Sequence, residues 1–79
     1  MFTVYVLKSL KDGKRYIGFT SELNRRFEEH NLGKVKSTKN RKPFELIYIE
    51  NFTIKSEAAE REKFFKTHKG RDFLDSIGK

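Results

Sequence analysis

The sequence contains no cysteine, only one proline and no long apolar run. Without cysteine the chain forms neither disulfides nor thiolate zinc sites, which fits an intracellular, reducing setting, and we expect a cytoplasmic protein. No apolar stretch approaches the roughly 18 residues that a membrane-spanning helix needs, and the N-terminus has the pattern of a strand rather than of a signal peptide. We therefore expect no membrane association.

Acidic residues are scarce relative to basic ones. Eleven Asp and Glu stand against 18 Lys and Arg, so the net charge is +7 in a chain of 79 residues. Such a charge on so short a chain indicates a polyanion or an anionic membrane surface as partner. We favour nucleic acid, with DNA as the expected partner.

The length limits the protein to one small domain, residues 1–79, with a single modest core. Hydrophobic residues make up 35% of the chain, enough for two short helices on a small sheet, and eight Phe and three Tyr argue against disorder. No repeat, low-complexity segment or interdomain linker is present. We take the protein to be a monomer.

Three strands are predicted. Phe2 to Leu7 alternates with apolar residues on both faces, Asp12-Gly13 is a strong turn signal, and Arg15 to Thr20 is the returning strand. Phe44 to Phe52 is rich in aromatic and branched residues and forms the third strand. In it, the alternation puts Phe44, Leu46 and Tyr48 on one face and Ile47 and Ile49 on the other.

The length of the first turn decides which residues of the hairpin face each other. A four-residue loop, positions 10–13, pairs Tyr5 with Gly18 and makes the rings of Tyr5 and Tyr16 diagonal neighbours. A two-residue loop pairs Tyr5 with Thr20, too far from Tyr16 for the rings to cooperate. In the register of the longer loop, Gly18 leaves room above the sheet for a ligand.

Two main helices and a short C-terminal helix complete the prediction. Ser21 is the expected N-cap of the first helix and Gly33 its end. Ser56 is expected to cap the second helix, which runs from Glu57 to about Thr67, and Gly70 to break it. The terminal helix contains Phe73, Leu74 and Ile77.

Glu62 is an anomaly on the second helix. It falls among the residues that define the apolar face, Ala58, Ala59 and Phe65. Burying a carboxylate costs several kcal/mol unless a cation or hydrogen-bond donors compensate it. We therefore expect a positive group beside Glu62.

A tyrosine and two basic side chains form a group suited to holding a phosphate. Arg26 and His30 lie four residues apart on the first helix, so they share one strip of its surface, and Tyr16 at the end of the second strand faces that strip. His68 has no metal-ligand partner at useful spacing and is expected at the surface. The basic residues expected to contact nucleic acid are Lys14, Arg15, Lys34, Lys36, Lys39, Arg41 and Lys42.

Together, Tyr5, Tyr16-Ile17-Gly18, Arg26, His30 and Glu62 resemble the signature positions of the GIY-YIG nuclease superfamily. The chain is most similar to its small, stand-alone bacterial members, over nearly its full length. This resemblance implies an α+β fold, a three-stranded antiparallel sheet flanked by helices.

Two residues of this sequence differ from the family pattern. Thr3 stands where the family has the glycine of its first motif, and no reactive group is lost by this change. Phe19 stands where some repair-nuclease relatives carry a lysine, which argues against a mechanism in which such a lysine assists the base.

The resemblance implies a metal-dependent endonuclease that hydrolyses phosphodiester bonds in DNA, with structure selectivity and a role in DNA repair or processing as expectations. Glu62 would hold one Mg²⁺ or Mn²⁺, and Arg26 would clamp the scissile phosphate. Either Tyr16 or His30 would accept a proton from the attacking water, and Tyr5 would position that water. No second acid is placed for another metal.

Other interpretations use the same residues. A nucleic-acid-binding module with weak or partner-dependent activity keeps the whole pattern, and an interaction protein with a decayed site keeps only the fold. The tyrosines can be core aromatics, Glu62 a structural acid paired with Lys or Arg, and the basic loop ordinary surface. The presence of both tyrosines, Arg26 and Glu62 favours the nuclease over a decayed site but does not separate it from the binding module.

Overall fold

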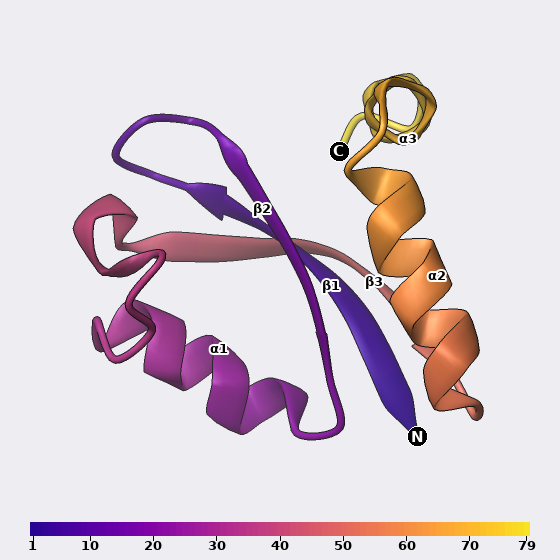
Figure 1. Ribbon diagram of the computed structural model, residues 1–79. Helices are drawn as coiled ribbons and strands as arrows, with labels where there is room; N and C mark the ends of the chain where they lie inside the picture. Colours follow the sequence, from indigo (N-terminus) through magenta and orange to yellow (C-terminus); the bar gives the residue numbers. More distant parts are fainter.

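A three-stranded antiparallel sheet with helices on both sides forms the protein (Figure 1). The strand order is β2-β1-β3, so the N-terminal strand is central and β2 is an edge. The predicted α+β fold is confirmed. None of the helices combines the length and the apolar character that a membrane span requires. The computed structural model describes all residues 1–79, with β1 Phe2–Ser9, β2 Arg15–Thr20, α1 Leu23–Asn31, a 3-10 helix Lys39–Arg41, β3 Phe44–Phe52, α2 Lys55–Phe65 and α3 His68–Ser76.

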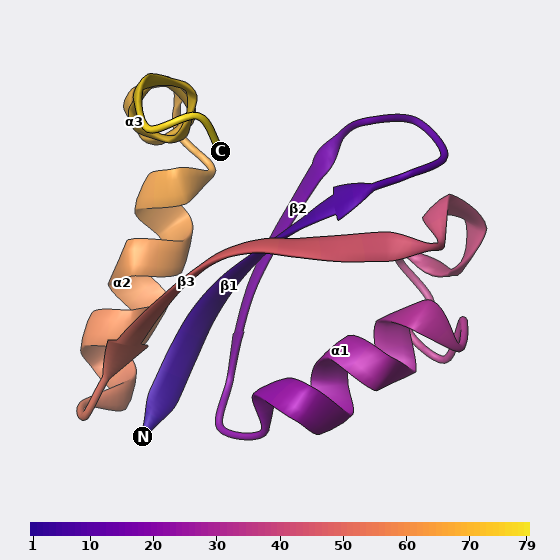
Figure 2. The same cartoon turned by 180° about the vertical axis from the view of Figure 1, so that it is seen from behind.

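The central strand carries a hydrophobic core on each face. Figures 1 and 2 show α1 on one side of the sheet and the α2–α3 pair on the other. The core on the α2–α3 side consists of Val4, Val6, Ile17, Ala58, Phe65 and Leu74. The core on the α1 side consists of Tyr5, Leu7 and Phe44, with Tyr16, Leu23, Phe27 and Leu46 packed against it.

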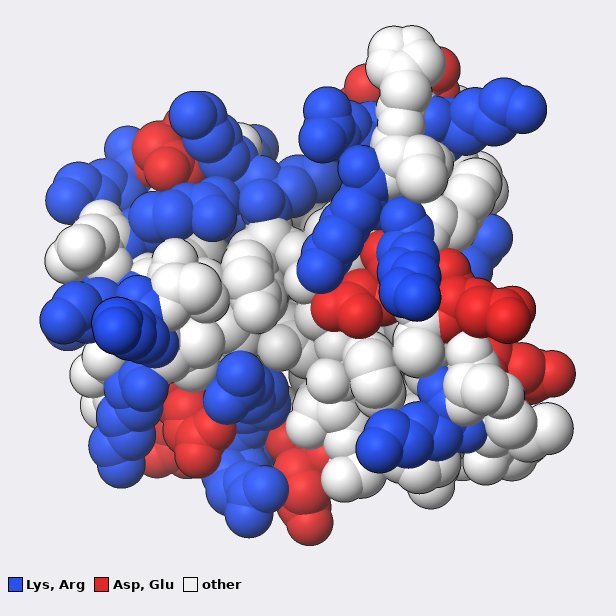
Figure 3. Space-filling model, viewed as in Figure 1, with Lys and Arg blue, Asp and Glu red and all other residues white.

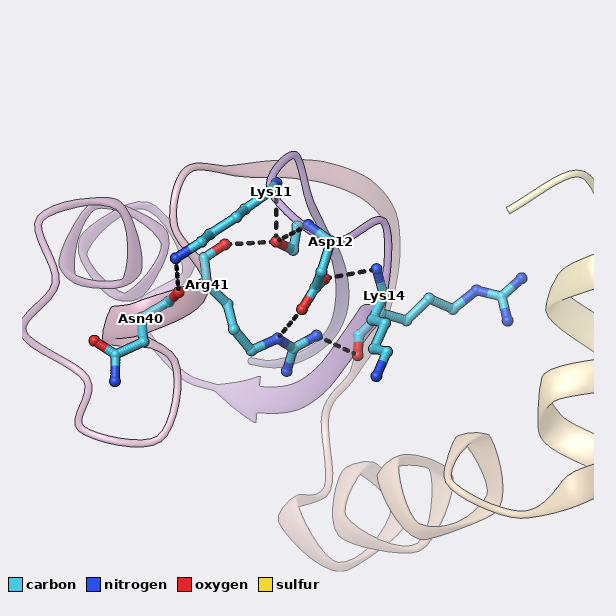
Figure 4. A network of polar contacts seen from close by, with 7 residues as sticks. Lys11, Asp12, Lys14, Asn40 and Arg41 are labelled. Atoms are coloured by element: carbon cyan, nitrogen blue, oxygen red, sulfur yellow. Dashed lines mark hydrogen bonds and ion pairs between the residues drawn. The ribbon is translucent and has the colours of Figure 1, made fainter.

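The β1–β2 hairpin has the longer of the two loops considered, the four-residue one, which places Tyr5 opposite Gly18. Ser9 N–H donates to the carbonyl of Lys14 at 2.9 Å, and Gly13 adopts φ +73°, which only glycine reaches without strain. The loop is tied to the 3-10 helix, because Arg41 pairs with Asp12 at 3.2 Å (Figure 4). Lys11 also donates to the carbonyl of Asn40, at 3.1 Å.

A bulge in β3 corrects the predicted alternation of that strand. Val6 pairs with Tyr48 and Leu7 with Leu46, so Ile47 is an extra residue and the strand changes face there. Leu46 stays on the α1 side with Phe44, whereas Tyr48 and Ile47 pack against the α2–α3 core. The prediction that Tyr48 shares a face with Leu46 is therefore wrong.

The end of α1 agrees with prediction and its start does not. Gly33 follows the helix with φ +76° and ends it as expected. Ser21 is not the N-cap, because α1 begins at Leu23 and its N-cap residue is Glu22, which makes no side-chain cap. The hydroxyl of Thr20 instead accepts the N–H of Glu22 at 3.0 Å, so the turn is stabilised one residue earlier.

Two predictions on the C-terminal helices are also wrong. Helix α2 begins at Lys55, so Ser56 lies inside it, and the helix ends at Phe65. Gly70 does not break a helix; it is buried within α3, where a side chain would collide with the carbonyl oxygen of Phe64. The break lies at Lys66-Thr67, and Thr67 caps α3 by accepting the N–H of Gly70 at 3.1 Å. Glycine is required here for the close approach of α3 to α2.

Candidate active site

Tyr5, from the central strand, leans over Gly18 of β2. A Cβ atom at Gly18 would lie 2.6 Å from the Tyr5 hydroxyl, so the missing side chain makes space for this ring. The prediction that Gly18 leaves room for a ligand is wrong, because the Tyr5 hydroxyl fills that room. Gly18 thus acts on the site by allowing Tyr5 to take its position.

A buried chain of hydrogen bonds, here called the relay, joins Tyr5, His30 and Thr38. The Tyr5 hydroxyl lies 3.0 Å from Nε2 of His30, and Nδ1 of His30 lies 2.8 Å from the Thr38 hydroxyl. Tyr5 is 1% exposed and His30 and Thr38 are 0% exposed. Thr38 donates to the carbonyl of Val35 at 3.4 Å, so it accepts from Nδ1–H of His30. Nε2 is then the acceptor for the Tyr5 O–H.

The relay is electrically neutral near pH 7. Burial, followed by the positive charge of Arg26, lowers the pKa of His30 to about 4. Burial raises the pKa of Tyr5 and outweighs the Arg26 guanidinium, which acts in the opposite direction. Because His30 has no exposed surface and its acceptor nitrogen is occupied, it does not contact solvent directly.

Tyr16 differs from Tyr5 in being open to solvent. Its ring centroid lies 4.9 Å from that of His30 and 6.4 Å from that of Tyr5. Its hydroxyl has no hydrogen-bond partner, and no side-chain polar atom in the protein is both buried and unpaired. The Tyr16 hydroxyl is therefore accessible to water or substrate.

Arg26, on α1, places a permanent positive charge beside the two tyrosines. Its Nη1 lies 3.3 Å from a carboxylate oxygen of Glu29, and its side chain is 39% exposed. Burial opposes the charge, but Tyr5 and Glu29 offset it, and the pKa of Arg26 is raised. The guanidinium is thus charged and partly accessible.

Glu62, on α2, lies close enough to Tyr5 for its negative charge to contribute to the raised pKa of Tyr5. Its side chain is 21% exposed, and its Oε2 pairs with Lys66 at 3.2 Å. Lys66 is thus the positive partner expected from the sequence, although Glu62 is only partly buried. Oε1 has no partner and, like the Tyr16 hydroxyl, is open to solvent.

The donors around Glu62 fit only a hard divalent ion such as Mg²⁺ or Mn²⁺. No group of three or more His, Cys, Asp or Glu that could hold a metal ion is present. A single open carboxylate oxygen is compatible with Mg²⁺ or Mn²⁺, because such hard ions keep several of their water ligands.

The predicted basic residues divide into two sets. Arg15 pairs with Asp75 at 2.5 Å and Arg41 with Asp12, so both hold the fold together. His68 is at the surface as predicted and lies 3.4 Å from Asp72. The other five predicted residues are exposed lysines that pair with no carboxylate: Lys14, Lys34, Lys36, Lys39 and Lys42.

Thr38 is a site residue that the sequence did not reveal. It is a neutral residue in a loop recognised only for its charge, and its eight-residue separation from His30 follows no helical or strand period.

Comparisons with known proteins identify the family of the chain. The family model of the GIY-YIG catalytic domain matches residues 1–74. The chain is 44% identical over 75 residues to the UPF0213 protein of Staphylococcus epidermidis, covering 94% of this chain and 90% of that protein. It is 48% identical over 63 residues to the UPF0213 protein YazA of Bacillus subtilis, covering 78% of this chain and 63% of that protein.

A solved structure is similar as well. The solution NMR structure of a UPF0213 protein from Bacillus halodurans superimposes with a TM-score of 0.59 at 36% sequence identity. The similarity covers 98% of this chain and 85% of that one.

Proposed function

This chain belongs to the GIY-YIG catalytic-domain family, and from that premise we propose that it is a metal-dependent endonuclease that hydrolyses phosphodiester bonds in DNA. The observation that carries the proposal is the convergence of Tyr16, Arg26 and Glu62 beside the relay. An open hydroxyl, an accessible cation and an open carboxylate oxygen together match the needs of phosphodiester hydrolysis.

Each side chain takes a role that its surroundings permit. Arg26 clamps the scissile phosphate through its planar guanidinium, which fits two phosphate oxygens at once. Glu62 would hold a single Mg²⁺ or Mn²⁺, which would supply charge neutralisation on the phosphate group.

Tyr16 is the residue that contacts the attacking water and accepts its proton. Its hydroxyl is open to solvent, whereas His30 has no exposed surface. Tyr5 and His30 remain neutral and hold the wall of the site through the relay.

One observation favours the second candidate, a DNA-binding module with weak or partner-dependent turnover. Oε2 of Glu62 is already paired with Lys66, so the carboxylate is shared between a structural partner and any metal ion. In that case the protein binds DNA without cutting it.

The test is nicking of supercoiled plasmid with Mg²⁺ or Mn²⁺, comparing wild type with Glu62→Gln and Glu60→Gln. Glu60 is an exposed acid on the same helix, so its variant makes the same charge change away from the site. We expect Glu62→Gln to abolish nicking and Glu60→Gln to retain it. Nicking that survives both Glu62→Gln and chelation would defeat the metal assignment. Binding without cutting on duplex, flap, single-stranded and RNA substrates would favour the module.

A further inference from the structure

A groove of about 690 Å³ lies between the β1–β2 hairpin and α3. Figure 3 shows a notch between these two parts of the molecule, with Lys and Arg atoms on both sides of it. Its lining contains six basic residues and no acid: Lys8, Lys14, Arg15, Lys66, Arg71 and Lys79, together with Gly13, Tyr16, Ile17 and Phe65.

Most of this positive charge is not neutralised by the protein. Arg15 pairs with Asp75 and Lys66 with Glu62. The other four cations, Lys8, Lys14, Arg71 and Lys79, form no ion pair with a carboxylate. Like charges gathered in one concave surface repel each other, so the arrangement favours a bound polyanion.

The groove is continuous with the candidate active site. Tyr16 lines the groove and also contacts the relay through its ring. Lys66, the ion-pair partner of Glu62, lies in the groove as well. A nucleic-acid strand whose scissile phosphate lies at Arg26 and Glu62 can therefore continue directly into this groove.

The shape of the groove indicates whether it binds a single strand or a duplex. Residues 13–17 line the groove consecutively, so it follows the edge strand β2 and is elongated. Its volume is that of an ordinary small-molecule pocket, about 300–1,000 Å³, which holds a few nucleotides of one strand but not a duplex. A cationic groove with an accessible aromatic ring, here Tyr16, is typical of single-strand binding.

We propose that the groove binds single-stranded nucleic acid beside the scissile phosphate, so the substrates of this site carry an unpaired segment there. The inference rests on the proposed function for the position of the scissile phosphate. It adds the substrate class and assigns Lys8, Lys66, Arg71 and Lys79 to nucleic-acid contact.

The test measures binding without cleavage, in the Glu62→Gln background with EDTA. The probes are a fluorescent oligothymidylate of about 12 nucleotides, within the usual range for such sites, and a blunt duplex. The groove variant is Lys14→Gln with Arg71→Gln, one cation from each wall. The matched control is Lys55→Gln with Lys63→Gln, two exposed lysines of α2 that lie outside the groove, which removes the same charge. A variant is included in the binding comparison only if its melting temperature equals that of the parent protein.

We expect the groove variant to weaken oligothymidylate binding about tenfold and to lower the salt slope by about 1.4, since each single-strand phosphate contact contributes about 0.7. The control variant on α2 should change oligothymidylate binding less than about twofold. Equal losses in both variants, or a larger loss on the duplex than on the single strand, would overturn the groove assignment. If the protein nicks plasmid but the groove variant binds oligothymidylate as well as the parent does, only the groove assignment is overturned. If oligothymidylate binding depends on the groove but no nicking occurs, only the proposed nuclease activity is overturned. Failure of the parent to bind any nucleic acid would overturn both.

Discussion

The protein contains two Tyr–Arg–Glu groups, and they differ in how their charges are satisfied. On the α2–α3 side, Arg61 grips Glu50 with two bonds of 2.7 and 3.1 Å, and Tyr48 donates to the same carboxylate at 2.6 Å. This group is closed, because its cation and its acid satisfy each other. It holds β3 to α2.

The second group, formed by Tyr16 of β2, Arg26 of α1 and Glu62 of α2, is open. Arg26 and Glu62 each have a neighbouring partner on their own helix, at 3.3 and 3.2 Å, and they do not pair with each other. The Tyr16 hydroxyl and one oxygen of Glu62 have no partner. The same residue types therefore build structure when they pair and offer a binding site when they are held apart.

The largest expected effect is on the nicking rate, which should depend on Arg26 and not on Arg61. Arg26→Ala should lower the nicking rate by about 10²–10³-fold, the usual loss when one charge-stabilising donor is removed from an active site. Its free energy of unfolding should change by less than about 0.5 kcal/mol, since the ion pair with Glu29 is exposed. Plasmid nicking and urea unfolding measure the two quantities; an inactive protein that is also strongly destabilised would contradict the assignment.

Arg61→Ala should show the opposite result. Arg61 lies over the rings of Phe64 and Phe65 at 4.7 and 4.6 Å, so its loss removes packing and leaves Glu50 without its cation. We expect a loss of about 2 to 3 kcal/mol in urea unfolding, less than for a fully buried pair because both side chains are partly exposed. The nicking rate per folded molecule should remain that of the wild type. Arg25→Ala, at an exposed residue of α1, is the control and should leave both quantities unchanged.

Thr38→Val tests whether the relay supports the open group. Valine keeps the shape of threonine and leaves Nδ1–H of His30 without an acceptor, which costs about 1 to 2 kcal/mol of stability. The nicking rate should also fall, because the His30 tautomer and the Tyr5 position are no longer fixed. Thr38→Ser retains the hydroxyl and should restore the rate. If serine and valine behave alike, the hydroxyl has no such role.

The pH dependence of stability gives the smallest effect. The pKa of His30 is about 4 in the folded protein and about 6.5 when unfolded, so the unfolded state binds the extra proton between these values. Stability should therefore fall as pH falls through this range, by about 1.5 kcal/mol between pH 6.5 and 5. Urea unfolding at several pH values measures the slope, and His68→Gln should not alter it. A flat profile in this window would show that His30 is not held neutral.

Several features of the fold could be predicted because they depend on neighbours in the chain. The Asp12-Gly13 turn signal and the alternation of β1 predicted the hairpin and two possible registers, one of which, with Tyr5 opposite Gly18, is present. Gly33 ended α1 as expected, because its positive φ is a local property of the backbone.

The features that were missed depend on tertiary contacts. Gly70 is a helix breaker by its own propensity, but the close approach of α3 to α2 requires it inside a helix. The bulge at Ile47 arises from pairing with β1, and Thr38 joins the site only because its loop folds back onto α1. No periodicity along the chain records these contacts.

The central claim is that Tyr16, Arg26 and Glu62 form one open site with room for a divalent ion. Titration of Mn²⁺ into the protein, followed by broadening of its backbone amide signals in NMR, tests this most directly. We predict that signals of Glu62 and of residues 16–18 broaden first in the wild type and that Glu62→Gln removes this effect. Broadening centred on other carboxylates, or unchanged in Glu62→Gln, would contradict the account.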